Sequence, residues 1–241
     1  DRGLEHDRRW MLIDPTGRFL SQRECAAMAC LHCAPNGNGF QVTDMRNGNS
    51  VDVPWSLADG ERINAKVWDD EVELLLGNAS IHQWFSEALQ RPVRLGYMAD
   101  STPRLTDPNY ANVPVALNDG FPALIISQAS LDDLNARLQT PVPMERFRPN
   151  FVIAGGVRYQ EDLWKDILFG AVRFSIVKPC FRCIIITTDQ QTGERSQEPL
   201  RTLATYHSEG NKVRFGMNAT FAGPGSLRVG DAIRLDDQID R

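Results

Sequence analysis

Residues 178–188 read KPCFRCIIITT, and this stretch contains the sharpest local feature of the chain, the Cys-x-x-Cys pair Cys180 and Cys183. Such a pair can be a redox dithiol, half of a zinc site, or one working thiolate beside a second cysteine without a role. The β-branched run that follows predicts a strand over Cys183–Thr188. A thioredoxin-like dithiol begins a helix whose dipole lowers the thiol pKa. The predicted strand therefore argues against the redox interpretation.

Cys183 is the stronger candidate for a working thiolate. Lys178 and Arg182 are close to it in the sequence, and neighbouring positive charge favours the thiolate form. A thiolate is a soft ligand that suits a soft metal centre. On the residues alone, a buried structural cysteine at the start of a strand stays open as the alternative.

The remaining three cysteines leave a second metal hypothesis open. A structural zinc site needs four ligands, and Cys30 and Cys33 could complete one with the later pair, although the sequence separation far exceeds that of a zinc ribbon. Cys25, Cys30 and Cys33 also lie among alanines, Met28 and Leu31, where a free cysteine packs as a small hydrophobe. Five cysteines at wide spacing do not resemble a disulfide framework. A reducing compartment, the cytoplasm, is the simpler expectation.

Charge and composition restrict the partners. The 241 residues carry a net charge of −5, so the surface as a whole does not attract nucleic acid, and no apolar stretch is long enough to cross a membrane. An anion site must therefore be local. Residues 146–150, RFRPN, place two arginines and an asparagine before a predicted strand and could hold a phosphate, although paired arginines are more often a solvated face. The chain opens without Met, and we expect a segment of a longer protein.

Short strands separated by turns predict a β-rich α+β architecture of barrel-like form. Asn78 is expected to cap one amphipathic helix that ends before Pro92. Ser130 is expected to begin a second helix ending near Leu138, and Pro199 a short third helix. The expected strands cover residues 9–13, 18–20, 63–68, 72–76, 93–98, 123–126, 150–153, 172–177, 183–188 and 232–235.

A series of motifs in a fixed order is similar to the MOSC domain, the module named after the C-terminal part of molybdenum cofactor sulfurases. An earlier pair of motifs resembles the MOSC N-terminal β-barrel domain. Together they resemble the YcbX-like bacterial proteins and the mitochondrial amidoxime-reducing component, over nearly the whole chain. The motifs are DRRWMLID at 7–14, GRFL at 17–20, RPNFVIAG at 148–155, EDLW at 161–164, KPCFRC at 178–183, TTD at 187–189, TG at 192–193, EPLRTL at 198–203, FGMN at 215–218 and LRVGD at 227–231.

The resemblance implies two β-barrel domains and a cofactor. A MOSC N-terminal domain with one amphipathic helix would span residues 1–100, a connecting loop 101–118, and a MOSC domain 119–241. The cofactor would be the molybdenum cofactor, a pterin that carries a phosphate, which arginines suit in an otherwise acidic protein.

The family motifs assign roles to individual residues. Cys183 would be the molybdenum ligand, and Cys180 a neighbour only. Arg8, Arg148 and Asn150 would hold the pterin. Asp119 would approach the site, and Cys183 and Asp119 would be the catalytic residues.

The sequence departs from the family pattern in two places. The opening Tyr-Pro-Val-Lys-Ser strand, whose Lys and Ser touch the cofactor, is absent. Beside Asp119, Gly120 and Phe121 replace small hydroxyl residues.

The function implied is molybdenum-dependent reduction of N-hydroxylated compounds, in which oxygen is removed from the substrate. Electrons would come from a separate redox protein or from a C-terminal ferredoxin domain outside this sequence. A cofactor carrier or sulfur-transfer module without turnover is the first alternative, and a structural zinc protein the second.

Overall fold

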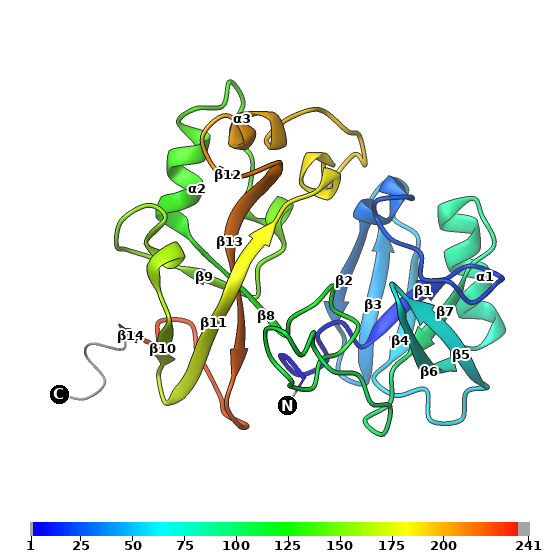
Figure 1. The fold of residues 1–241 in the computed structure, drawn as a ribbon. Coiled ribbons are helices and arrows are strands. Elements are labelled where there is room, and N and C mark those ends of the chain that lie inside the picture. Colours follow the sequence, from blue (N-terminus) through cyan, green and yellow to red (C-terminus); the bar gives the residue numbers. More distant parts are fainter. Residues whose placement is uncertain (1, 236–241) are drawn as a thin grey trace.

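The computed structural model describes residues 2–235, which form two β-rich lobes (Figure 1). The first lobe contains strands β1 to β7 and helix α1. The second lobe contains strands β8 to β14 with helices α2 and α3. The expected β-rich α+β architecture is confirmed, since strands dominate and only three α-helices occur in the described chain.

The first lobe is built from two antiparallel sheets. One sheet has the order β1-β7-β6-β5 and the other β2-β3-β4. The turn at residues 14–17 forms as predicted, and Gly17 adopts a φ of +85° there, which favours glycine. The strands are β1 (Trp10–Ile13), β2 (Leu31–Pro35), β3 (Gly39–Asp44), β4 (Ser50–Pro54), β5 (Arg62–Val67), β6 (Asp70–Leu76) and β7 (Arg94–Tyr97).

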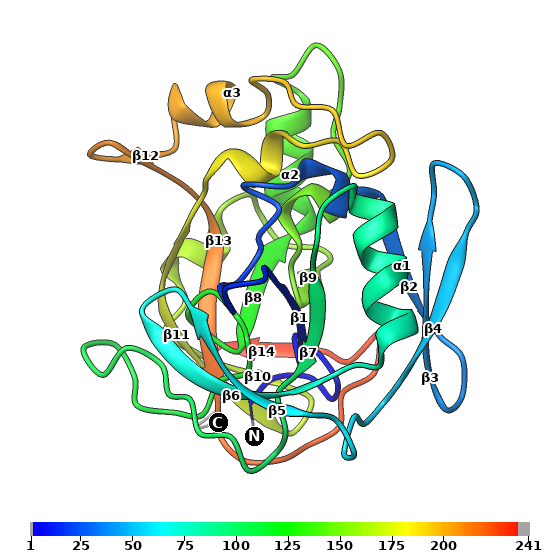
Figure 2. The ribbon, with the colours of Figure 1, turned by 90° about the vertical axis from the view of Figure 1, so that its right-hand side faces the viewer.

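Helix α1 (Ala79–Leu89) closes the first lobe, and its cap forms as the sequence predicts. The Asn78 side chain accepts a hydrogen bond from the Ile81 amide at 3.0 Å. Ile81, Phe85 and Leu89 form the buried face and join the core beneath the β2-β3-β4 sheet. Figure 2 shows the helix along the outer side of this lobe. Burial of one apolar face thus fixes the orientation of the helix.

The second lobe is one seven-stranded sheet with a core on each side. The strand order is β14-β10-β11-β13-β8-β9, with β12 paired to β13, and only the β8–β9 pair is parallel among the described strands. Its elements are β8 (Ala123–Ser127), α2 (Gln128–Asn135), β9 (Phe151–Ile153), β10 (Asp166–Phe169), β11 (Val172–Phe181), α3 (Leu200–Ala204), β12 (Ser208–Glu209), β13 (Lys212–Phe221) and β14 (Ile233–Leu235).

The start of α2 corrects the predicted cap. The helix begins three residues before the expected position because Ser127, and not Ser130, is its N-cap and accepts from the Ser130 amide at 3.1 Å. The Ser130 hydroxyl instead donates to the buried carboxylate of Glu161 at 2.8 Å. A tertiary partner 31 residues away in the chain, invisible to a local pattern, therefore decided the role of Ser130.

The predicted strand over Cys183–Thr188 is wrong. Residues Ile184–Thr187 form a single 3-10 helix, η4, and Cys183 is its N-cap residue. Strand pairing between β11 and β13 ends at Phe181, so no neighbouring strand is available for residues 183–188. Ile186 packs instead into the core between α2, α3 and β13. Tertiary burial overrides the strand preference of the β-branched run.

The segment between the lobes lies along the first lobe before it enters β8. Buried Arg104 fixes it by donating to the Ala116 and Asn118 carbonyls at 2.6 and 2.7 Å, and by pairing with Asp70 at 2.8 Å. These bonds hold the chain immediately before Asp119. Among residues 2–235 no helix is long and apolar enough to span a membrane.

Candidate functional site

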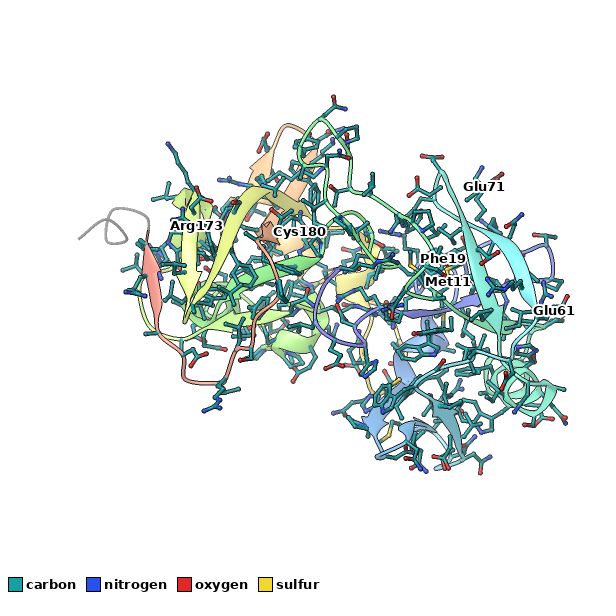
Figure 3. The ribbon with its side chains drawn as sticks, turned by 90° about the horizontal axis from the view of Figure 1, so that it is seen from below. Met11, Phe19, Glu61, Glu71, Arg173 and Cys180 are labelled. Atoms are coloured by element: carbon teal, nitrogen blue, oxygen red, sulfur yellow. The ribbon has the colours of Figure 1, made fainter. Side chains whose placement is uncertain are left out.

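A cavity of about 430 Å³ lies where the two lobes meet. Both lobes line it, and all five predicted site residues are on its wall. In Figure 3 the lining residues Met11 and Phe19 lie in the first lobe, and Cys180 lies in the second. The five predicted site residues on the wall are Arg8, Asp119, Arg148, Asn150 and Cys183.

Irregularities at the end of β11 place the cysteine pair at this cavity. The register with β13 shifts between Ile176 and Lys178 and again between Pro179 and Phe181, as expected of a strand that contains proline, which cannot donate to the ladder. After the second shift the chain leaves the sheet and turns into η4 at Cys183. Both cysteines are half-buried and line the cavity, and Cys180 also packs against the core of the second lobe.

The cation that contacts Cys183 comes from the other lobe. Arg23 lies in a turn after β1, and its Nε is 3.3 Å from the Cys183 sulfur. Its Nη2 donates to the Asp119 carboxylate at 2.9 Å. Arg23 therefore joins two predicted site residues that are 64 positions apart. The sequence analysis missed it, and no local motif marks it.

The two cations expected beside Cys183 act elsewhere, which corrects the prediction. The Lys178 ammonium lies 3.8 Å from the centre of the Tyr110 ring, on the connecting segment. Arg182 donates to the carbonyls of Phe215 and Phe147 at 2.8 and 3.0 Å. Lys178 lies on β11 and Arg182 lies between β11 and η4, and proximity in the sequence could not reveal the direction of either side chain.

Arg8, Arg148 and Asn150 form a connected group across the lobes. Arg8 donates to the Arg148 carbonyl at 3.2 Å and pairs with Asp7. Asp7 in turn accepts from the Asn150 side-chain Nδ2 at 2.9 Å, and the Asn150 Oδ1 accepts from the Leu124 backbone amide at 3.0 Å. The Asp-Arg motif of the first lobe and the Arg-Pro-Asn motif of the second are thus parts of one arrangement.

The backbone at both arginines is left-handed, with φ of +49° at Arg8 and +55° at Arg148. Such conformations are uncommon outside glycine, Asn and Asp and concentrate at functional sites. They allow each arginine to leave a loop toward the cavity instead of continuing a regular element.

Electrostatics at Arg148 favour an anionic ligand. Desolvation within the concave wall lowers the pKa of the Arg148 guanidinium, and the neighbouring positive charge of Arg8 lowers it further. Both causes destabilise the cation, and an anion bound between the arginines would offset them. The arrangement therefore suits a phosphate or carboxylate.

Unpaired polar atoms collect at the same cavity. Among the described residues, nine buried side-chain nitrogen or oxygen atoms lack a hydrogen-bond partner, and six of these belong to residues on the cavity wall. A buried polar group without a partner costs about 1–3 kcal/mol, so their concentration indicates a polar ligand. The six residues are Trp10, Gln22, Arg23, Asn118, Arg146 and Arg182. A pterin with a phosphate fits this set, because it offers acceptors to the guanidinium groups and donors to the two carbonyl oxygens.

The alternative zinc site is not formed. Within residues 2–235 no three His, Cys, Asp or Glu side chains lie close enough together to hold a metal ion among themselves. Cys25 and Cys30 are buried, as the packing interpretation expects, while Cys33 is exposed on β2 and faces the cavity.

Family models match both lobes. Residues 1–92 match the MOSC N-terminal beta barrel domain, and residues 112–234 match the MOSC domain. The second match covers half of the chain, and the fold and the interlobe cavity agree with it. The chain therefore belongs to the MOSC family.

Individual relatives fall into two groups. The chain is 31% identical to mitochondrial amidoxime-reducing component 1 of Homo sapiens, over 97% of this chain and 74% of that protein. It is 30% identical to mitochondrial amidoxime reducing component 2 of Rattus norvegicus, over 96% and 73%. It is also 32% identical to the molybdenum cofactor sulfurase of Oryza sativa, over 89% of this chain but only 29% of the relative. The chain thus spans about three quarters of the first group and under a third of the sulfurase.

Proposed function

We propose that the chain is a molybdenum-cofactor-dependent oxidoreductase that reduces N-hydroxylated compounds such as amidoximes. The observation that carries the proposal is the interlobe cavity, where a half-buried thiol, two arginines in left-handed conformations and a concentration of unpaired polar atoms meet. The similarity to two amidoxime-reducing components over about three quarters of their length supports this class of substrate.

Each residue has a distinct task in this proposal. Cys183 supplies the single protein thiolate for the metal, and Cys180 remains a packing residue. Arg148, Arg8 and Asn150 hold the pterin, and the two arginines bind its phosphate. When bound, the cofactor supplies the two-electron chemistry that removes oxygen from the substrate nitrogen.

Asp119 shares the Arg23 guanidinium with Cys183. It is exposed to the cavity, and Arg23 holds its carboxylate. A carboxylate at this position can accept a hydrogen bond from the protonated nitrogen of an amidoxime or hydroxylamine, and can hold a proton for the departing oxygen. The proposal assigns it both positioning and proton exchange.

Electrons must come from another protein or domain. An iron–sulfur cluster needs four cysteine thiolates at a recognisable spacing, and the five cysteines of this sequence do not have it. We expect no iron–sulfur absorbance from this chain and no steady turnover with NADH or NADPH alone. Steady pyridine-nucleotide-dependent turnover without an added carrier would contradict this.

Elemental analysis and turnover test the proposal in sequence. The chain is purified from a host that makes the molybdenum cofactor, and its molybdenum, zinc and pterin contents are measured. Reduction of an aromatic amidoxime is then followed with a chemically reduced viologen dye as the electron source. We expect near-equal molybdenum and pterin, together with amine product. Stoichiometric zinc without molybdenum would overturn the proposal.

A cofactor carrier or sulfur-transfer module is the second candidate. The match to the Oryza sativa sulfurase favours it, because it covers 89% of this chain at an identity similar to that of the reductases. Cofactor binding without amidoxime reduction in the same assay would select this candidate.

The domain boundaries and the cellular compartment are also open to test. The domain boundaries are proposed at 1–100, 101–118 and 119–241, and limited proteolysis within 101–118 would test them. The cytoplasm is the proposed compartment, while two relatives carry the word mitochondrial in their names. Localisation of the tagged full-length protein would decide between the compartments.

A further inference from the structure

The turn that carries Arg23 is held from both lobes. Within the first lobe, the amides of Glu24 and Cys25 donate to the Ser21 carbonyl, each at 3.0 Å. The Arg23 amide is 3.2 Å from the Ser21 hydroxyl, and Ser21 itself is buried. This compact turn fixes the backbone from which the Arg23 side chain extends to the second lobe.

An arginine of the second lobe, Arg195, forms hydrogen bonds with the same turn. The Arg195 Nη2 donates to the carbonyls of Gln22 and Arg23 at 2.5 and 3.0 Å. Arg195 also contacts the Thr188 hydroxyl at 3.3 Å and forms an isolated bridge with Thr188. Thr188 directly follows η4, whose N-cap is Cys183. The short segment that begins at the thiol thus returns to hold the backbone of the arginine that contacts the thiol.

The plane of the Arg23 guanidinium is fixed by an aromatic ring. Its central carbon lies 4.4 Å from the centre of the Trp68 ring, and Trp68 packs edge-on against Phe19 at 5.3 Å. Stacking leaves the edge of the guanidinium free to donate. Nε and Nη2 use that edge for Cys183 and Asp119, while Nη1 is buried without a partner.

We propose that Arg23 is a positioning residue for Cys183 and Asp119, delivered from the first lobe and locked in place by Arg195. Its Nε and Nη2 atoms together fix the position of the sulfur relative to the carboxylate. This requires both lobes, because Arg23 belongs to the first lobe and its two partners to the second. The assignment of Cys183 to a metal rests on the proposed function; the geometric link between the lobes does not. No other side-chain donor contacts the Cys183 sulfur among residues 2–235.

Four variants separate this role from a surface ion pair. Arg23→Gln removes the guanidinium group. Arg23→Lys keeps the positive charge but can contact only one of the two partners, Cys183 or Asp119. Arg195→Gln releases the turn and leaves Arg23 intact. Arg18→Gln is the matched control, because Arg18 belongs to the same hairpin and makes a two-pronged contact with Glu24, with no contact to the second lobe.

The first measurement needs no cofactor. Thermal unfolding of the cofactor-free chain is measured for Arg23→Gln paired with Arg195→Gln, and for Arg23→Gln paired with Cys183→Ala. We expect each single change at Arg23 and Arg195 to lower the unfolding temperature by about 2–4 °C. In both double variants, the decrease in unfolding temperature should be smaller than the sum of the decreases in the two single variants. Strict additivity in both pairs would overturn the link.

The second measurement uses the loaded protein. We expect Arg23→Gln to lose molybdenum more than pterin and to shift the electron paramagnetic resonance signal of Mo(V), which reports the surroundings of the metal ligand. Arg195→Gln should change the same signal less, Arg23→Lys should restore part of it, and Arg18→Gln should leave it unchanged. A spectrum and molybdenum content for Arg23→Gln equal to those of Arg18→Gln would overturn the positioning role.

The two measurements also separate this inference from the proposed function. Absence of molybdenum from the unmodified chain would contradict the proposed function. The unfolding temperatures of the single and double variants would still decide whether Arg23 positions Cys183. If Arg23→Gln does not fold, Arg23→Lys and Arg195→Gln carry both tests.

Discussion

The two lobes contribute different chemistry to the cavity between them. The second lobe supplies the Cys183 thiol and the exposed Asp119 carboxylate, while the first lobe supplies the Arg23 cation that contacts both. Arg8 of the first lobe also contacts Arg148 of the second lobe at the cavity wall. Residues of both lobes therefore line the cavity, and the proposed site lies at the interface between the lobes.

The lobes also differ in how they hold their polar residues. The cap of α1 in the first lobe is a local contact of Asn78 with the amide three residues on. The cap of α2 in the second lobe belongs to a buried network in which Ser127, Ser130 and Glu161 are linked across 34 residues. Changes to local contacts should have small effects, and changes to residues coupled over distance larger ones.

The largest effect is expected at the cysteine pair. Cys183→Ala should abolish molybdenum retention, because it removes the proposed thiolate ligand, whereas Cys180→Ala should only weaken it through lost packing. Metal content per polypeptide after purification measures both. Equal loss of molybdenum in the two variants would refute the single-ligand assignment and would indicate that both cysteines bind the metal.

The second largest effect is expected at Arg148, on the part of the cavity wall proposed to bind the phosphate. Arg148→Ala should weaken pterin binding by about 10-fold or more, since a hydrogen bond to a charged group is worth about 1.5–3 kcal/mol. Pterin content and the dissociation rate of the cofactor give the measurement. Thermal unfolding of the cofactor-free variant is the control, because a collapse there would show that Arg148 is structural.

A pH experiment compares a carboxylate that has partners distant in the sequence with a carboxylate whose partners lie within one turn. The hydrogen bond from Arg137, together with those from Tyr159 and Arg158, lowers the pKa of Asp133 in the second lobe from 3.8 to about 2. A carboxylate with a lowered pKa stabilises the fold at pH values above its pKa in the unfolded chain. This stabilisation is lost as the pH falls through its pKa in the folded state. Asp133→Asn should therefore unfold at a lower temperature at pH 7, and its difference from the parent should vanish between about pH 4 and pH 2.

Asp14 of the first lobe is the control for this experiment. The Thr16 hydroxyl lowers its pKa as well, but its contacts lie within one turn at the surface. Asp14→Asn should show the same sign with a smaller amplitude. An amplitude equal to that of Asp133→Asn would remove the distinction between the lobes.

The smallest effect is expected at the local cap. Asn78→Ala should lower the free energy of unfolding by about 1 kcal/mol, the usual value of an N-cap, and leave molybdenum content unchanged. Ser127→Ala should cost more, about 1–3 kcal/mol, because it leaves the buried Ser130 amide without an acceptor. Denaturant midpoints measure both, and equal midpoints would contradict the proposed difference between local and network caps.

Local residue patterns were sufficient for much of the fold. Turn residues at 14–17, the short strand runs between turns in the first lobe, and the Asn78 cap with its apolar stripe all act over fewer than about ten residues. Their energetics are set by neighbours in the chain, so a sequence determines them directly. The order of the motifs also sufficed to identify the MOSC family and to select residues that line one cavity.

Tertiary structure decided what the chain brings together over long distances. The run after Cys183 became a 3-10 helix because strand pairing ends at Phe181 and the core between α2, α3 and β13 accepts Ile186. Ser130 turned from a predicted helix start into a partner of Glu161. The cation beside Cys183 proved to be Arg23, 160 residues away, and not its neighbours Lys178 or Arg182. Local preferences are worth a fraction of a kcal/mol per residue, whereas burial and the pairing of buried polar groups are worth several times more, so the packed lobes, and not the sequence neighbourhood, selected these contacts.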